Sequence, residues 1–396
     1  RHPGLHDTRA STPPGPPRHP GLHDAERRTR LHSVHGNEDV LVSVGGPADR
    51  GVGLLTLNRP KAINSLTHPM VGRISAALSA WENDDAVRAV VISGAGDRGL
   101  CAGGDVIAIY HSAKAGGAEA RQFWSDEYRL NAYIARYPKP SVALMDGITM
   151  GGGVGISAHC SVRVVTETTK MAMPEVGIGF VPDVGGTFIL SRTPGLLGIH
   201  AALTGAPFTG ADAIAMGFAD HFVPRERLSA FTEAILASDI ATAVAAFAED
   251  PPPSPLLAER EWIDHCYAGT TVSDIVAALR GHDTAGNTGG PAGRIGGTTA
   301  VEAANLIASR SPVSLSVALE AVRRAASLNN LEDALRQEFR TSCGALRSHD
   351  LVEGIRALLI DKDRNPQWSP ASLSSVTTAD IDGYFVSADP DLTFEP

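Results

Sequence analysis

Cysteine and long hydrophobic runs are both scarce in this chain of 396 residues. The four cysteines are Cys101, Cys160, Cys266 and Cys343. They form no CxxC pair and are too few and too scattered for a disulfide framework, which favours a reducing compartment. The most apolar stretch, residues 231–248, is interrupted by Glu233 and Asp239. A membrane helix needs about 20 consecutive apolar residues, so we expect no membrane span.

Several catalytic motifs are also missing. The chain has no GxxxxGK[ST], GxSxG, HExxH or EF-hand pattern, so nucleotide hydrolysis, serine esterase and metalloprotease chemistry find no support. Residues 94–99 fit GxGxxG after an apolar strand, but no strand ends in an acidic residue about 20 positions later. A dinucleotide site is therefore disfavoured. The histidines show no spacing typical of a metal site, so we predict no metal.

The charge is distributed unevenly. The net charge is −10, but residues 1–35 hold six Arg against three acidic residues, a local +3 that leaves −13 for the remainder. A body this acidic is a poor partner for nucleic acid, and we expect none. An anionic ligand is compatible with this charge, because backbone N–H groups or a few local cations suffice to bind one.

The composition divides the chain into three parts. Residues 1–37 are rich in Pro, His and Arg, repeat the heptapeptide RHPGLHD and lack apolar periodicity, so we expect a disordered tail. A histidine metal tract and a transit peptide are weaker interpretations, given the absent ligand clusters, the acidic residues and the prolines. Residues 38–224 alternate short apolar strands with helical stretches, and residues 225–396 are mainly helical.

These patterns predict an α/β fold with largely parallel strands and a helical C-terminal region. Among the later helices, a long one is expected from Leu331 towards Leu359. The Gly-rich stretch 282–298 is expected to be a loop between helices.

Two glycine clusters follow apolar strands: CAGGD at 101–105 and MGGGVG at 150–155. Glycines here allow close backbone approach and leave N–H groups directed outward at the start of a helix. Tight packing of helix against strand is the alternative role of either cluster. Together they predict a convergent pair of N–H donors, which is an oxyanion hole.

Two acidic residues lie in an apolar loop. The segment MPEVGIGFVPDVGG places Glu175 and Asp183 eight residues apart among Val, Ile, Pro and Gly. Desolvation would raise their pKa values towards a range useful for acid/base catalysis. Helix capping or pairing with surface arginines is the alternative role.

In this order, the segments resemble the crotonase (enoyl-CoA hydratase/isomerase) superfamily. The matching blocks are LNRPKAIN at 57–64, CAGGD, DGITMGGGVG at 146–155 and PEVGIGFVPDVGGT at 174–187. The resemblance implies a spiral core of ββα repeats with helices at the C-terminal end. It also implies that the thioester of an acyl-CoA lies between the N–H groups of Gly104 and Gly152.

The same resemblance implies where coenzyme A is held. The matching positions are Lys61, Ala62, Ala102, Asp105 and Val106, with Lys61 as a phosphate partner. Coenzyme A would enter as part of the substrate, and no other cofactor is implied.

Hydratases of this superfamily use two glutamates, but the first of these positions is Gly155 here. The pattern is closer to the 3-hydroxyisobutyryl-CoA hydrolase subfamily, which Glu175, Asp183 and Glu127 match, as does the block LVEGIRALLIDKDRNPQW at 351–368. The resemblance implies hydrolysis of a short branched 3-hydroxyacyl-CoA, such as 3-hydroxyisobutyryl-CoA from valine breakdown. Glu175 would act as nucleophile or as general base, while Glu127 and Asp183 would bind the substrate hydroxyl and water.

Two rival functions stay open at this point: a hydratase or isomerase that uses Glu175 alone, and a non-catalytic acyl-CoA-binding protein. A homo-oligomer, trimeric or hexameric, is also implied by the resemblance. Arg outnumbers Lys 29 to 5, and Ala and Gly are abundant, which is typical of GC-rich bacterial genomes. From this we expect a cytoplasmic enzyme.

Overall fold

The computed structural model describes residues 38–284 and 299–394. The tail predicted for residues 1–37 lies outside the described residues. So does most of the Gly-rich stretch expected as a loop from residue 282, although the helix before it continues to Thr284.

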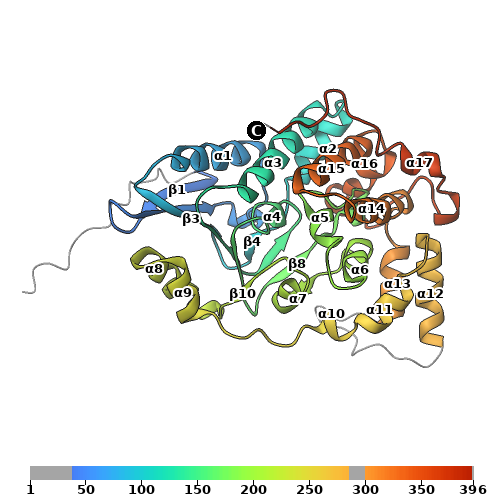
Figure 1. Cartoon of the computed structure of the whole chain (residues 1–396). Coiled ribbons are helices and arrows are strands. Elements are labelled where there is room, and N and C mark those ends of the chain that lie inside the picture. The colour runs from blue at the N-terminus through green and yellow to red at the C-terminus, as the bar shows by residue number, and fades with distance from the viewer. Residues whose placement is uncertain (1–37, 285–298, 395–396) are drawn as a thin grey trace, which may run out of the picture.

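Two sheets form the centre of the molecule (Figure 1). The six-stranded sheet has the order β1 (Val40–Gly45), β2 (Gly51–Leu57), β3 (Val87–Gly94), β5 (Ser141–Met145), β7 (Val162–Val165) and β10 (His221–Phe222). The four-stranded sheet has the order β4 (Gly99–Cys101), β6 (Ile148–Met150), β8 (Lys170–Ala172) and β9 (Phe208–Thr209). Among the strand pairs of the described residues, β1 with β2 and β8 with β9 are antiparallel, and the others are parallel. The predicted α/β class with largely parallel strands is confirmed.

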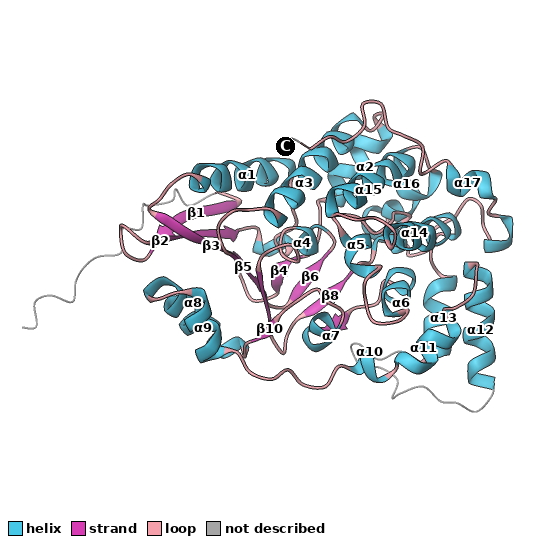
Figure 2. Cartoon of the chain, in the orientation of Figure 1, coloured by secondary structure: helices cyan, strands magenta, loops and turns pink. Residues whose placement is uncertain are grey.

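Helices surround these sheets (Figure 2). Those before residue 224 are α1 (His68–Glu82), α2 (Val106–Lys114), α3 (Ala118–Ala135), α4 (Gly152–Gly155), α5 (Gly186–Leu190), α6 (Leu197–Thr204) and α7 (Gly210–Ala215). In α1, Met70, Ile74 and Leu78 recur at helical spacing and are buried, and the Thr67 side chain caps the first turn by accepting from the Met70 N–H.

Past residue 224 the described chain is mainly helical. Its helices are α8 (Leu228–Ala237), α9 (Ile240–Phe247), α10 (Pro255–Ala258), α11 (Arg260–Cys266), α12 (Val272–Thr284), α13 (Ala300–Ala308), α14 (Pro312–Ala325), α15 (Leu331–Leu346), α16 (His349–Ile355) and α17 (Thr378–Asp382). A single turn of π-helix, Arg356–Ile360, extends α16.

The prediction of one long helix from Leu331 towards Leu359 was wrong. The chain turns after α15, and the Ser348 hydroxyl caps α16 by accepting from the Asp350 N–H. Serine competes for backbone hydrogen bonds and therefore favours a new helix start over continuation.

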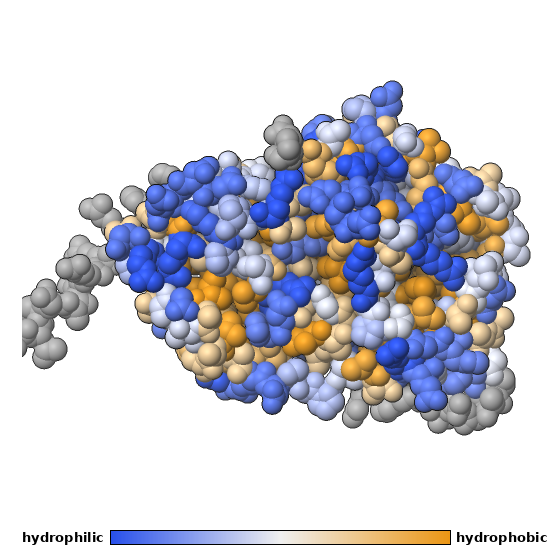
Figure 3. Space-filling model, viewed as in Figure 1, coloured by the Kyte–Doolittle hydropathy of each residue, from blue (hydrophilic) through white to orange (hydrophobic). Residues whose placement is uncertain are grey.

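A smaller second core lies where α8 and α9 cover the six-stranded sheet. Phe231 and Ile235 of α8 and Ala243 of α9 are buried there with Val91 of β3 and Val164 of β7. Figure 3 shows apolar side chains at the surface in the region of these two helices. Within the described ranges, no helix is long and apolar enough to cross a membrane.

Candidate active site

Three segments leave the four-stranded sheet at the same edge. Strands β4, β6 and β8 are parallel neighbours, so their carboxyl ends lie side by side. The first glycine cluster follows β4, the second follows β6, and the loop carrying Glu175 and Asp183 follows β8. The sheet therefore brings together motifs that are up to about 80 residues apart in sequence.

The two glycine clusters provide unused backbone donors. Gly103 and Gly151 adopt φ values of +110° and +47°, which L side chains rarely take, and these turns direct the following N–H groups out of the sheet. Within the described residues, neither the Gly104 nor the Gly152 N–H donates a hydrogen bond. The Gly104 nitrogen lies 3.3 Å from the position of a Cβ added to Gly152, so the donors are close neighbours. An oxyanion hole needs two unused donors that lie this close together.

These glycines open onto a cavity of about 220 Å³. It is lined by Ala102, Gly103, Gly104, Val106, Ile109, Phe123, Trp124, Glu127, Gly151, Gly152, Pro174, Glu175, Ile178, Phe180, Asp183, Leu351, Ile355, Leu358 and Leu359. Glu127, Glu175 and Asp183 are the three lining residues with an ionisable side chain. The cavity thus combines an apolar wall with three acids and two free N–H groups.

All three acids are buried, at 2%, 6% and 5% exposure for Glu127, Glu175 and Asp183. Burial, and next the charge of Asp183, raise the pKa values of both glutamates well above their usual range. Burial also raises the pKa of Asp183 to about 7, against the opposing effect of a hydrogen bond from Tyr128. Among the described residues, Oε1 of Glu127 and Oε2 of Glu175 have no hydrogen-bond partner, which leaves them available to a substrate or water.

Asp183 is held differently from the two glutamates. The Tyr128 hydroxyl donates to Asp183 Oδ2 at 2.6 Å, and Tyr128 also contacts the Ser342 hydroxyl at 2.7 Å. Tyr128 comes from α3, one residue after Glu127, and Ser342 comes from α15. The Asp183 carboxylate is therefore oriented by a helix from each half of the chain.

The structure gives a steric reason for the glycine at position 155. A Cβ added there would lie 2.7 Å from the Val184 Cβ and 2.8 Å from the Asn131 Nδ2. The space that a side chain would need is already filled. The glutamate that hydratases carry at this position therefore has no room in this packing.

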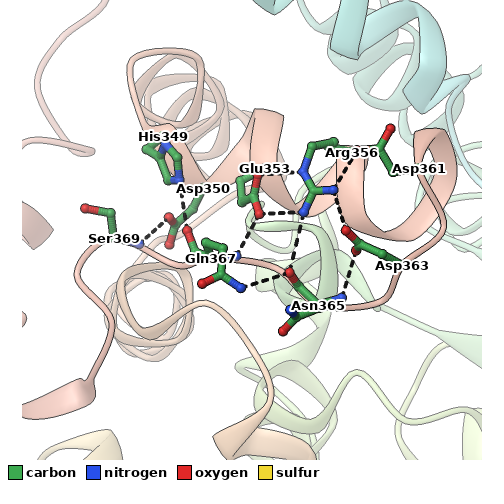
Figure 4. A network of polar contacts seen from close by, with 9 residues as sticks. All are labelled: His349, Asp350, Glu353, Arg356, Asp361, Asp363, Asn365, Gln367 and Ser369. Carbon is green, nitrogen blue, oxygen red and sulfur yellow. Dashed lines mark hydrogen bonds and ion pairs between the residues drawn. The ribbon is translucent and has the colours of Figure 1, made fainter.

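The outer wall of the cavity comes from the block at 351–368. Leu351 and Ile355 of α16, with Leu358 and Leu359 of the π-helical turn, line the cavity. Figure 4 shows the Arg356 guanidinium in contact with the carboxylates of Glu353, Asp361 and Asp363. Arg356 thereby ties the wall to the loop that follows it.

The residues implied for coenzyme A divide into two groups. Ala102 and Val106 line the cavity. Lys61 and Ala62 do not line it; they are exposed on a short 3-10 helix, Pro60–Ala62. The Asp105 side chain caps α2 and pairs with Arg59 at 3.2 Å, so it is bound within the protein.

Sequence reasoning missed part of this site. Phe123, Trp124 and Phe180 form an aromatic wall in which the Trp124 and Phe180 rings stack at 5.0 Å. Tyr128 adjoins Glu127 in the motif SDEY, and the leucines of 351–368 were recognised only as a matching block. The apolar content of these segments was the feature of the sequence that could have indicated them. A single sequence, however, does not show which apolar side chains face a cavity.

The free thiol nearest in sequence to this site is that of Cys101. Cys101 is fully buried beside it, and burial raises the pKa of its thiol to about 12, which disfavours a thiolate nucleophile. In the ranges that the structure describes, no group of three His, Cys, Asp or Glu side chains is arranged to hold a metal ion.

Comparison with known proteins places this site in a family. Residues 52–385 match the family described as Enoyl-CoA hydratase/isomerase. The chain belongs to this family. A solved structure described as a carnitinyl-CoA dehydratase from Mycobacterium thermoresistibile is 65% identical, with a TM-score of 0.84 over 91% of this chain and 99% of that one. The expected crotonase-like fold is thus confirmed.

Curated relatives are similar over nearly their whole length. A protein from Danio rerio is 38% identical, covering 91% of this chain and 94% of its own, and one from Homo sapiens is 39% identical, covering 85% and 86%. Both are named 3-hydroxyisobutyryl-CoA hydrolase, mitochondrial. The resemblance to that subfamily is confirmed.

The expected cytoplasmic location was wrong, because these relatives are named as mitochondrial proteins. That expectation depended on the excess of Arg over Lys and the abundance of Ala and Gly. Such a bias follows the base composition of a genome and carries no information about the compartment of an enzyme.

Proposed function

We propose that the protein hydrolyses the thioester of a short branched 3-hydroxyacyl-CoA, most specifically 3-hydroxyisobutyryl-CoA. The observation that carries this proposal is that Gly104 and Gly152, whose N–H groups are unused among the described residues, line one cavity with the buried Glu175, while position 155 has no second acid. The names of the curated relatives support the same substrate.

In the first step, the thioester carbonyl accepts hydrogen bonds from Gly104 and Gly152. These bonds strengthen as negative charge develops on the oxygen, and each is worth about 3 kcal/mol in comparable sites. The Glu175 carboxylate attacks the carbonyl carbon, the C–S bond breaks, and the coenzyme A thiolate leaves and takes up a proton. Water then hydrolyses the mixed anhydride and regenerates Glu175.

Glu175 acting as general base is the second route to the same products. It would remove a proton from a water molecule as that water attacks the thioester carbonyl. Both routes convert the thioester and one water into a carboxylic acid and free coenzyme A. The unpartnered Oε2 of Glu175 is compatible with either route.

Asp183 and Glu127 bind the 3-hydroxyl group and the water in this proposal. Their raised pKa values keep a proton available near neutral pH, so these carboxyls donate as well as accept hydrogen bonds. Trp124 and Phe180 contact the branched carbon chain. A hydroxylated, compact acyl group therefore complements the cavity.

Coenzyme A lies outside the acyl cavity in this proposal. Ala102 and Val106 contact its thioester end, the backbone at Asp105 follows the same path, and Lys61 with Ala62 contacts the phosphate end. Exposure of Lys61 suits an ammonium that binds phosphate in an otherwise acidic protein. No cofactor beyond the substrate is part of the mechanism. A trimeric or hexameric homo-oligomer is a separate proposal, which sedimentation analysis tests.

Dehydration or hydration of an acyl-CoA is the second candidate, because the 65% identical structure is described as a dehydratase. Glu175 would then have to move the proton alone, since Gly155 replaces the other glutamate. The packing around Gly155 favours hydrolysis.

One assay separates the two functions. The protein is incubated with 3-hydroxyisobutyryl-CoA and with crotonyl-CoA while free thiol and the absorbance of the enoyl thioester are followed. Hydrolysis predicts thiol release from the first substrate, which Glu175→Gln abolishes and the exposed control Glu119→Gln on α3 preserves. Loss or gain of enoyl absorbance without thiol release would overturn the proposal.

A further inference from the structure

The loop that carries Asp183 has an unfavourable backbone conformation. Val184, the next residue, has φ of +54°, a left-handed value that β-branched side chains avoid because of clashes with their own backbone. Such a conformation persists only where the surroundings hold it. His159 provides one contact, a 2.7 Å hydrogen bond between its Nε2 and the Val184 carbonyl oxygen.

A second contact comes from Glu338 in the middle of α15. This side chain is fully buried, yet it does not line the cavity. Its Oε2 accepts from the Gly185 N–H at 2.6 Å, and its Oε1 accepts from the Thr187 N–H at 2.9 Å and from the Thr187 hydroxyl. One carboxylate thus binds the backbone on the far side of Val184.

One turn further along α15, Ser342 reaches the carboxylate of Asp183 through Tyr128. Tyr128 has a single hydroxyl proton and donates it to Asp183, so Ser342 must be the donor in its 2.7 Å contact with Tyr128. Both hydroxyls are buried. Ser342, Tyr128 and Asp183 therefore form a directed chain of hydrogen bonds.

We propose that α15 positions Asp183 at two points: Glu338 fixes the backbone of residues 184–187, and Ser342 with Tyr128 fixes the direction of the carboxylate. Glu338 and Ser342 are positioning residues, since neither lines the cavity. Their spacing of four residues places both on one face of α15. This inference rests on the proposed function, in which Asp183 binds the substrate 3-hydroxyl.

The inference is specific to substrates that carry the hydroxyl. If α15 aims Asp183 at that group, weakening the contacts reduces turnover of 3-hydroxyisobutyryl-CoA and leaves isobutyryl-CoA, which lacks the hydroxyl, nearly unaffected. A general structural role would reduce both rates equally. The ratio of the two kcat/KM values is therefore the informative quantity.

The variants are Glu338→Gln, Ser342→Ala and Asp183→Asn, alone and combined. Gln at 338 retains one oxygen acceptor but directs an NH2 group at a backbone N–H, and Ala at 342 removes only the final donor. Thr341→Val is the matched control, because it removes a buried hydroxyl on the same helix that bonds only the Glu338 carbonyl oxygen.

We expect Glu338→Gln and Ser342→Ala each to lower kcat/KM for 3-hydroxyisobutyryl-CoA about tenfold and for isobutyryl-CoA less than about twofold. Neither change should add to the loss already caused by Asp183→Asn. Equal losses on both substrates, or full additivity with Asp183→Asn, would overturn the inference.

Crystal structures of the ligand-free variants provide a readout that does not need activity. We expect the Asp183 carboxylate to rotate away from its present direction in Ser342→Ala, and residues 184–187 to shift in Glu338→Gln. An unchanged Asp183 in both would contradict positioning by α15. Failure of the unaltered protein to release thiol from any acyl-CoA would instead refute the proposed function, and these structures would still test the positioning.

Discussion

Glu127 packs directly against Gly152: a Cβ placed on the glycine would lie 2.6 Å from Oε1 of the glutamate. The oxyanion donor and the acid proposed to bind substrate are therefore in contact, and the contact leaves no room for a methyl group. A change in either residue displaces the other. This relationship makes Gly152 a sensitive point of the site.

Gly152→Ala should reduce kcat strongly. The added methyl pushes Glu127 aside and displaces an oxyanion donor, and loss of one such donor typically lowers kcat about 10²–10³-fold. Steady-state thiol release measures this. Gly72→Ala is the control, because no described atom other than the neighbouring backbone of α1 lies within 4 Å of a Cβ at that position. The control should be active and slightly more stable, since Ala favours a helix by about 0.5–1 kcal/mol over Gly. Equal activity of the two variants would contradict the assigned role.

Gly155→Ala should destabilise the protein by about 1–3 kcal/mol, since overpacking forces Val184 and Asn131 apart. Urea unfolding measures the change. In the part of the chain that the structure describes, neither side-chain polar atom of Asn131 has a hydrogen-bond partner, so Asn131→Ala creates space without breaking a side-chain hydrogen bond. The double variant should therefore lose less stability than the sum of the single variants. Strict additivity would show that Asn131 does not occupy the space in question.

Asp183→Asn should make the protein more stable at pH 8 and leave it unchanged at pH 4. The folded state raises the pKa of Asp183 to about 7, so it disfavours the ionised form. The resulting loss of stability is absent below the unfolded pKa of about 3.9 and grows as the pH rises towards 7. Asn removes this cost and still accepts from Tyr128. Thermal unfolding at both pH values tests the sign, and a variant that is less stable at pH 8 would contradict it.

The rate of hydrolysis should rise with pH, and the midpoint of this rise should lie well above the ordinary glutamate pKa of about 4.3. Glu175 must be ionised to attack or to remove a proton, and burial raises its pKa. The measurement is kcat/KM for thiol release between pH 4.5 and 8.5. A profile that is flat above pH 5 would show that no buried carboxyl limits the reaction.

Arg356→Ala should raise KM several-fold with a smaller effect on kcat. Arg356 ties the cavity wall to the following loop through Glu353, Asp361 and Asp363 (Figure 4), but it does not reach the reacting groups. Arg356→Lys should recover only part of the loss, because an ammonium lacks the planar fork that binds several carboxylates. The exposed pair of Arg227 and Glu249 offers a control, and Arg227→Ala should leave KM unchanged.

Much of the fold and site was predictable because the signals are local. Strand and helix patterns come from apolar spacing within a few residues, and consecutive glycines at a strand end indicate a turn in which the backbone approaches a neighbour or a ligand closely. The break between α15 and α16 was missed, since a serine inside an amphipathic pattern is a weak signal until its hydroxyl is seen to cap Asp350. The position of Glu338 could have been noticed in the sequence, because an acidic residue stands there between Leu335 and Ser342 on the buried face of α15.

The sequence by itself determined the α/β class, the two glycine-rich segments and the apolar loop that carries Glu175 and Asp183, because each depends on residue type and short-range spacing. Glu127 was indicated only by the resemblance to the hydrolase subfamily. Only the tertiary structure decided that β4, β6 and β8 present these turns at one edge, that Asn131 and Val184 fill the space at Gly155, and that α15 holds Asp183. These relationships join residues 24 to 214 positions apart. Packing in three dimensions sets such distances, and no local pattern in one sequence encodes them.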